Sequence, residues 1–296
     1  MTDRILDLSE EPAFLKLRMN NIIVEREGMD PISIHLPEVA AIVASHKRVV
    51  FTQSVLAGVA GNNGIVVVCD DKFMPVGMML PLRGNSLQSE KFAQQAAAAL
   101  PVKKRIWRQL VIAKVRAQGR LLKELNGDDS GLMAMAKKVK SGDSTNVEAQ
   151  AARRYWVSLF GDDIFHRHRD GEDQNRFLNY GYSVLRAIVT RAICATGLHP
   201  ALGVHHHNRY DTFCLSDDII EPFRPIVDRA VHHVVKERGA DAPMDQALRY
   251  ALIRPLYDKY SVSGESRTLF DALTRTSASL AEVFAGNKTK ILLPEI

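Results

Sequence analysis

Cysteine is scarce in this 296-residue sequence, and its three cysteines, Cys69, Cys194 and Cys214, lie far apart. This number and spacing exclude a disulfide framework and a cysteine-rich zinc site, so we expect reduced thiols in a cytoplasmic protein. No apolar run approaches the roughly 18 residues that cross a bilayer, and the amino-terminal segment is acidic and broken early by Pro12. The sequence therefore predicts neither a membrane-spanning nor a secreted protein.

Glycine-rich phosphate-binding motifs are also missing. There is no GxxxxGK[ST] segment and no GxGxxG segment after a predicted strand, which argues against ATP hydrolysis and dinucleotide redox chemistry. Cys194 and Cys214 lie in apolar surroundings without a flanking base, so a cysteine nucleophile is disfavoured as well.

Charge is unevenly divided along the chain. Lys and Arg total 39 against 34 Asp and Glu, a formal net charge of +5. Residues 1–82 hold 7 basic and 10 acidic side chains, whereas the remaining 214 residues hold 32 and 24. A basic excess confined to one part is typical of a protein that binds a polyanion. On charge alone, a basic solvated surface explains the numbers equally well.

Hydrophobic periodicity divides the chain into two parts. Residues 13–26 alternate on a two-residue period around a turn at Asn20-Asn21 and predict a hairpin, residues 65–69 predict a buried strand, and a short helix is expected within 45–60. The helical period dominates from about residue 86. The fold class is therefore α+β: a small N-terminal β-sandwich-like domain over 1–82, a linker over 83–85 and a larger all-helical catalytic domain over 86–296. Helices are expected near 86–99, 102–125, 130–140, 145–159, 173–196, 217–238, 244–259 and 265–284, the fifth ending at Gly197 as a left-handed cap.

The helix that follows Pro101 is unusually basic. It carries eight cations before its first acid, Glu124: Lys103, Lys104, Arg105, Arg108, Lys114, Arg116, Arg120 and Lys123. Such charges repel one another unless a partner neutralises them, and a phosphate backbone does so while it releases counterions. Further groups occur near 137–140, at Arg153-Arg154 and near 166–169. A solvated face explains any one group, but together they favour a nucleic acid.

Two segments carry candidate metal ligands. Glu148 follows Thr145 by three residues, which is also the pattern of a capping box. His205-His206-His207 precede a predicted helix with Asp218 and Glu221 at a spacing of three, so imidazole and carboxylates could converge on one cation. This mixed donor set suits Mn²⁺ or Mg²⁺ better than zinc. The alternatives are that Asp218 and Glu221 cap the helix and that the histidines only form hydrogen bonds.

Four segments in this order resemble the CRISPR-associated integrase of the adaptation module, the Cas-one family, in its type II branch. They begin at Asn146 (NxEAxAAxxYW), Gly197 (GLHPALG), His206 (HxN) and Ser216 (SDDIIEPFRP). The resemblance covers nearly the whole chain and extends to the small β domain, short linker and helical domain of that family.

The resemblance implies a metal-dependent DNA integrase and endonuclease of CRISPR spacer acquisition. Members join the 3′-hydroxyl ends of a short duplex to the CRISPR repeat by transesterification. By position, the metal ligands are Glu148, His206 and Glu221, with Asp218 as an auxiliary catalytic acid. Three adjacent histidines leave the ligand register open by one, and His206 is chosen because it precedes Asn208 by two. The predicted DNA contacts are Lys103, Lys104, Arg105, Arg108, Arg153 and Arg224.

The resemblance also implies partners. These are double-stranded DNA, as prespacer and as CRISPR repeat; a second copy of the chain, bound through the β domain; a small ferredoxin-like protein of the Cas-two family; and the effector nuclease. Two other functions stay open: a catalytically silent DNA-binding scaffold, and a metal-dependent phosphodiesterase that hydrolyses but never joins strands.

Overall fold

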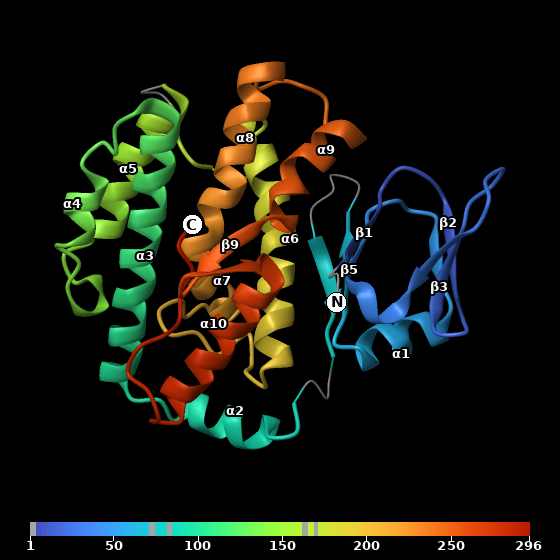
Figure 1. Ribbon diagram of the computed structural model, residues 1–296, viewed down its shortest axis with the longest axis horizontal. Coiled ribbons are helices and arrows are strands. Elements are labelled where there is room, and N and C mark those ends of the chain that lie inside the picture. Colours follow the sequence, from blue (N-terminus) through green and yellow to red (C-terminus); the bar gives the residue numbers. More distant parts are fainter. Residues whose placement is uncertain (1–3, 71–74, 82–84, 162–164, 169–170) are drawn as a thin grey trace.

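The computed structural model describes residues 4–70, 75–81, 85–161, 165–168 and 171–296. Strands β1 to β8 gather at one end of the molecule and the long helices at the other, with α6 (Gln174–Ala195) between them (Figure 1). The predicted α+β class is confirmed. None of the helices in these ranges is long and apolar enough to cross a membrane. Residues 82–84, at the predicted domain boundary and linker, lie outside the described residues.

Two four-stranded sheets form the amino-terminal part, as the alternating sequence predicts. One has the order β1-β5-β7-β8 and the other the order β4-β3-β2-β6. The strands are β1 Arg4–Leu8, β2 Ala13–Arg18, β3 Asn21–Glu25, β4 Ile32–His35, β5 Val39–Ala44, β6 Val49–Phe51, β7 Ile65–Cys69 and β8 Pro75–Met79. The sheets enclose a small core of apolar residues together with α1 (Gln53–Gly61).

Two local expectations in this part need adjustment. The hairpin of β2 and β3 turns at Met19-Asn20, one residue earlier than predicted, because Asn21 already pairs with Arg18. Both turn residues have positive φ, 49° and 60°, as a two-residue hairpin turn requires. The expected helix of 45–60 is shorter, because residues 49–51 form β6, which runs parallel to β2.

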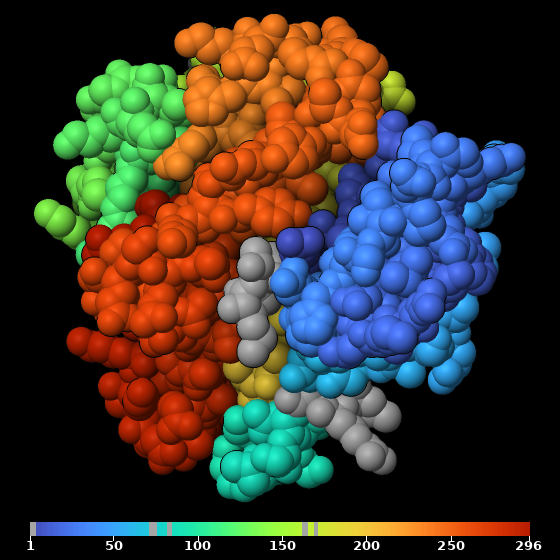
Figure 2. Space-filling model, turned by 45° about the vertical axis from the view of Figure 1, so that its right-hand side comes forward, coloured from blue at the N-terminus to red at the C-terminus, as the bar shows by residue number. Residues whose placement is uncertain are grey.

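The sheet that contains β5 belongs to two cores at once. All six residues of β5 are buried, as expected of a strand covered on both faces. Ile42 points into the small core between the sheets, whereas Ala41 and Val43 belong to the large core of the helical part. Polar contacts add to this junction, because Arg191 of α6 donates a hydrogen bond to Asn63 O at 3.0 Å. Figure 2 shows the amino-terminal part, in blue, lying alongside the helical part.

The helical part is built around α6, most of whose residues are buried. The helices are α2 Gln88–Ala96, α3 Leu100–Asn126, α4 Leu132–Ala136, α5 Val147–Phe160, α6 Gln174–Ala195, α7 Cys214–Ile220, α8 Arg224–Arg238, α9 Gln246–Ile253 and α10 Leu269–Phe284. α6 is followed by Gly197 with φ 82°, which confirms the predicted left-handed cap. The expected helix of 217–238 is two helices, α7 and α8, joined by a 3₁₀ turn over Glu221–Phe223.

The prediction of an all-helical second part is wrong. Strands β9 (Lys259–Val262) and β10 (Glu265–Thr268) form an antiparallel hairpin that takes in the predicted connection of 260–264 and the first four residues of the predicted helix of 265–284. Its turn, Ser263-Gly264, has positive φ at both residues, 52° and 80°, as a two-residue hairpin turn requires. The predicted helix of 244–259 is correspondingly reduced to α9 and a short 3₁₀ turn.

Candidate active site

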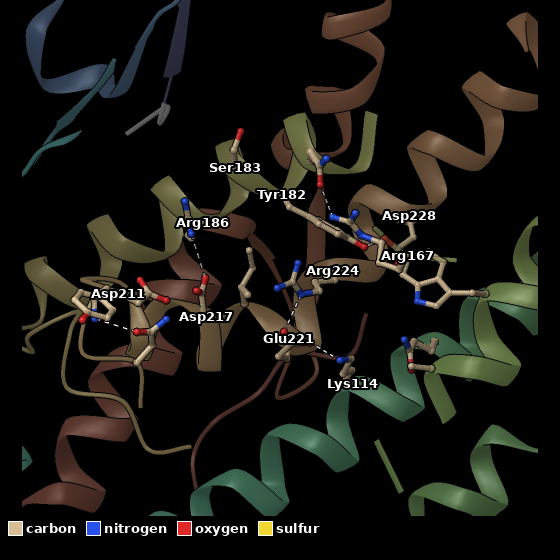
Figure 3. Close-up of a pocket in the computed structure, with 17 residues that line it drawn as sticks. Lys114, Arg167, Tyr182, Ser183, Arg186, Asp211, Asp217, Glu221, Arg224 and Asp228 are labelled. Carbon is tan, nitrogen blue, oxygen red and sulfur yellow. Dashed lines mark hydrogen bonds and ion pairs between the residues drawn. The ribbon is translucent and has the colours of Figure 1, made fainter. Parts of the chain in front are cut away.

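Two glutamates from distant parts of the sequence meet at one lysine. Lys114 projects from the middle of α3, and its Nζ lies 2.6 Å from Glu148 Oε1 and 2.5 Å from Glu221 Oε2. Glu148 stands in the first turn of α5, and Glu221 starts the 3₁₀ turn after α7. Figure 3 shows Lys114 and Glu221 facing each other in the lining of a cavity. The two predicted carboxylate ligands are thus brought together around a cation.

Glu148 is not occupied in capping its own helix, so the capping-box interpretation is wrong. The carboxylate of Asp143 accepts hydrogen bonds from the backbone N–H groups of Val147 and Glu148, both at 2.9 Å, and so satisfies the start of α5. The N-cap residue is Asn146, whose side chain makes no capping bond. The side chain of Glu148 is therefore left to face α3 and Lys114.

Glu221 is a buried carboxylate held between two cations. Arg224 donates a hydrogen bond from Nε to Glu221 Oε1 at 2.9 Å, while Lys114 approaches the other oxygen. Burial by itself would raise the pKa of Glu221, but Arg224 and Lys114 outweigh burial and lower that pKa to about 2. Glu221 therefore stays ionised at neutral pH. Arg224, predicted as a DNA contact, is mostly buried and also lies 4.4 Å from the centroid of the Tyr182 ring.

Asp218 organises the histidine loop from inside α7. Its carboxylate is fully buried and accepts hydrogen bonds from the backbone N–H groups of Val204, His205 and His206 at 2.6, 3.1 and 3.1 Å. The interpretation of Asp218 as a helix cap is wrong, because α7 begins four residues earlier at Cys214. Asp218 therefore fixes the position of the loop, and its role as an auxiliary acid stays a prediction.

His206 is the histidine that this arrangement singles out. Its Nδ1 lies 2.8 Å from Asp218 Oδ1, and this hydrogen bond raises the pKa of the imidazole although burial opposes it. The neighbouring ring of His205 is instead stacked on Trp107, with 4.1 Å between centroids. Gly203 permits this packing, because a Cβ there would lie 2.5 Å from His206 O and 3.0 Å from Asp218 Oδ2. His206 is thus the histidine that the buried carboxylate orients, and its choice as a metal ligand stays a prediction.

The three predicted metal ligands do not form a closed cluster as they stand. Among the described residues, no group of three or more His, Cys, Asp or Glu is placed to hold a metal ion. Nevertheless, the donor chemistry fits a hard cation, because carboxylate oxygens are the ligands that Mg²⁺ and Mn²⁺ prefer. The buried Glu221 Oε2 lies 2.5 Å from the ammonium of Lys114, which satisfies it. The pair of carboxylates is therefore a place built for positive charge.

A cavity of about 740 Å³ opens beside Glu221. It takes its walls from α3, α5, α6, α7, α8 and the loop before α7 (Figure 3). Cations line it on several sides, and the most prominent are Lys114, Arg167, Arg186 and Arg224. Of these, Arg186 is paired at 3.6 Å with Asp217. The lining also holds four carboxylates, Asp211, Asp217, Glu221 and Asp228, so the cavity brings cations and anions together rather than being uniformly basic.

Other predicted DNA contacts lie on helix surfaces away from the cavity lining. Lys104, Arg105 and Arg108 are exposed on the first half of α3, Lys103 is half-buried there, and Arg153 is exposed on α5. Arg108 also donates a hydrogen bond from Nε to Val139 O at 2.9 Å. Sequence reasoning missed Lys114 as a site residue, because it counted this lysine as one of eight in the basic helix.

A buried carboxylate closes the back of the cavity. Asp228 of α8 accepts hydrogen bonds from the hydroxyl groups of Tyr182 and of Tyr155, the latter at 2.7 Å. Burial raises the pKa of Asp228 to about 6, although both tyrosine bonds and Arg224 act against this. The three side chains tie α5, α6 and α8 together behind the carboxylate pair.

Asp228→Asn should lower the free energy of unfolding by about 1–3 kcal/mol, because one amide oxygen replaces two acceptors for buried tyrosine donors. The raised pKa means that the folded protein holds this proton between about pH 4 and pH 6 while the unfolded chain has released it. The contribution of Asp228 to the free energy of unfolding of the wild type therefore falls as pH rises through that window. Asparagine does not titrate, so urea unfolding should show a larger loss at pH 5 than at pH 8. Tyr155→Phe keeps the carboxyl group and should retain the pH dependence; an Asp228→Asn loss that is equal at both pH values would contradict the assignment.

The fold and the site together define a class: an α+β protein whose helical part holds carboxylates and a histidine beside a cavity lined by both cations and carboxylates. The chain belongs to the CRISPR associated protein Cas1 family, whose family model matches residues 6–246. The resemblance that the sequence motifs indicated is thereby confirmed. A relative named CRISPR-associated endonuclease Cas1, from Neisseria meningitidis serogroup C (strain 8013), is 31% identical over 285 residues, or 95% of this chain and 93% of the relative.

Solved structures share the fold of this chain. A casposase bound to integration product superposes with a TM-score of 0.77 at 20% identity and covers 97% of this chain and 92% of its own. A Cas6-RT-Cas1–Cas2 complex matches with a TM-score of 0.75 at 17% identity, over 99% of this chain and 36% of that chain. At these identities the likeness is one of fold.

Proposed function

We propose that this protein is a metal-dependent DNA integrase and endonuclease of CRISPR spacer acquisition. It joins the 3′-hydroxyl ends of a short DNA duplex to the CRISPR repeat by transesterification, in the cytoplasm, where the array lies. The observation that carries the proposal is the meeting of Glu148 and Glu221 around one cation, beside a loop that presents His206. The family, and relatives named as endonucleases and as a casposase with its integration product, support the same activity.

Each residue of the centre has a part in this mechanism. Glu148, Glu221 and His206 would hold Mg²⁺ or Mn²⁺, which when bound polarises a phosphoryl oxygen and activates a hydroxyl nucleophile. Arg224 keeps Glu221 ionised and fixed, and Asp218 orients His206 through its ring nitrogen. The cations of the cavity, such as Arg167 and Arg186, would position DNA phosphates next to the carboxylates, so that the attacking hydroxyl and the phosphorus lie close together.

Partners follow from the family. A second copy of this chain and a Cas2-like protein would complete the assembly, by analogy with the Cas6-RT-Cas1–Cas2 complex, in which a chain of this fold occurs together with Cas2. The effector nuclease is a further proposed partner in the choice of prespacers.

An integration assay tests the proposal. The protein, with and without a Cas2-like partner, is incubated with a labelled 3′-hydroxyl duplex and a supercoiled plasmid bearing the repeat, in Mn²⁺, Mg²⁺ or EDTA. Label joined covalently to the plasmid in metal but not in EDTA is the expected result. DNA binding without transfer under every condition would favour a silent scaffold, and nicked plasmid without transfer would favour a hydrolase.

Replacing Arg105 and Arg108 by Gln should weaken DNA binding to a similar extent for all sequences. Each lost phosphate contact should reduce the slope of log affinity against log salt by about 1. Arg254→Gln is the matched control, because its guanidinium pairs with Asp258 on a different element. Fluorescence anisotropy over a salt series measures both quantities. A slope that does not change would place the DNA path elsewhere on the surface.

A further inference from the structure

We propose that Lys114 is a built-in counter-cation of the active site. Its ammonium lies between Glu148 and Glu221, and a divalent ion held by these two carboxylates has to displace it. As a consequence, metal and DNA bind cooperatively. The inference deepens the proposed function and rests on it, because it concerns the same carboxylates.

The first argument is one of space. Lys114 Nζ lies 2.6 Å from one carboxylate and 2.5 Å from the other, and its side chain is only 12% exposed. A Mg²⁺-sized ion binds carboxylate oxygens at about 2.0–2.1 Å. An ion bound to both of these oxygens would overlap the ammonium nitrogen. The lysine and a bridging divalent ion therefore exclude each other.

The second argument is one of charge. Two glutamates, Glu148 and Glu221, face two cations, Lys114 and Arg224, so the formal charges of these four side chains cancel. Adding a divalent ion leaves an excess of two positive charges in a mostly buried site, which is costly at low dielectric. DNA phosphates supply the missing negative charge. By linkage, DNA then raises the affinity for metal, and metal raises the affinity for DNA by the same factor.

Of the two cations, Lys114 is the one able to leave. Arg224 is fixed by its hydrogen bond to Glu221 and by contact with the Tyr182 ring. Lys114 carries its charge on a flexible four-carbon chain, and it also lines the 740 Å³ cavity. A turn of that chain into the cavity takes the ammonium to the place proposed for DNA phosphates. The displaced lysine would then contribute to phosphate binding.

Calorimetric titration of the full-length protein with Mn²⁺, without DNA, tests the inference. Lys114→Met should bind Mn²⁺ about tenfold more tightly than the wild type, because the competing charge is gone. Lys123→Met, an exposed lysine of the same helix, should match the wild type. Lys114→Arg keeps the charge and should not bind more tightly. Equal or weaker Mn²⁺ binding by a folded Lys114→Met protein would overturn the proposal.

A second measurement uses the wild type and so does not depend on a variant that folds poorly. Duplexes with 3′-deoxy ends, which cannot be joined, should raise the Mn²⁺ affinity of the wild type about tenfold or more and that of Lys114→Gln by less. No change in the wild type would overturn the coupling. Glu221→Gln should lose the site altogether. If it binds Mn²⁺ like the wild type, the metal assignment in the proposed function fails, whereas an unchanged affinity in Lys114→Met overturns only the role of the lysine.

Discussion

Glu221→Gln should reduce strand joining by at least about a hundredfold, to the background of the assay, while DNA binding measured in EDTA stays intact. The substitution keeps the shape of the side chain but removes the negative charge that Lys114 and Arg224 surround. Glu148→Gln should have the same effect from the other side of the centre. The joining assay with labelled duplex and plasmid measures the rate, and anisotropy measures the affinity for DNA.

The matched control for these variants is Glu124→Gln. Glu124 is exposed on α3 and pairs with Arg229, so the same chemical change falls outside the centre. The double variant of Glu148 and Glu221 should be little worse than either single variant, because both residues act in one unit. A normal joining rate in either single variant would remove that residue from the active site.

Asp218→Ala should lower the joining rate about as strongly as loss of His206 itself, although Asp218 lies behind the loop. Its carboxylate holds three backbone N–H groups and the His206 ring, so its removal leaves the histidine without a fixed position. Misplacement by about 1 Å can cost a hundredfold in rate. Gly203→Ala should act on the same loop by a different route, because its Cβ would overlap His206 O.

Circular dichroism establishes whether these two loop variants are folded, and the joining assay compares them with alanine variants of the three histidines. His206→Ala should abolish joining, and His205→Ala and His207→Ala should be milder. If His205→Ala or His207→Ala is the more damaging, the assigned register is wrong. If folded Asp218→Ala joins at the wild-type rate, the loop does not need its buried carboxylate.

Much of the fold was predictable because it depends on local pattern. The two-residue alternation of the first part and the long helical stretches of the second are properties of neighbouring residues. The hairpin of β9 and β10 was missed for the opposite reason. Its strands are only four residues long, so the predicted connection of 260–264 was too short to show a two-residue alternation, and β10 falls on the start of the predicted helix of 265–284.

Of the candidate active site, only the proposed ligands were predictable from the sequence. Glu148, His206 and Glu221 could be chosen from motif positions, and the structure brings the two glutamates together. Lys114 could not be recognised, because nothing in the neighbouring sequence distinguishes this buried lysine from the seven other cations of the same helix. Its role depends on α3 crossing α5 and the turn after α7, which is a matter of tertiary packing. The pairing of Arg224 with Glu221 likewise depends on the folded turn after α7, so the sequence alone did not reveal it.

The sheet shared by the two cores has a consequence for how this protein unfolds. One face of β5 belongs to the small core and the other to the large core around α6, so neither part keeps its apolar surface covered without the other. Cutting the chain near residue 82 would expose the hydrophobic surface of the helical part that the sheet with β5 normally covers. Heat should therefore melt strands and helices in a single cooperative transition, and an isolated catalytic half should aggregate instead of folding.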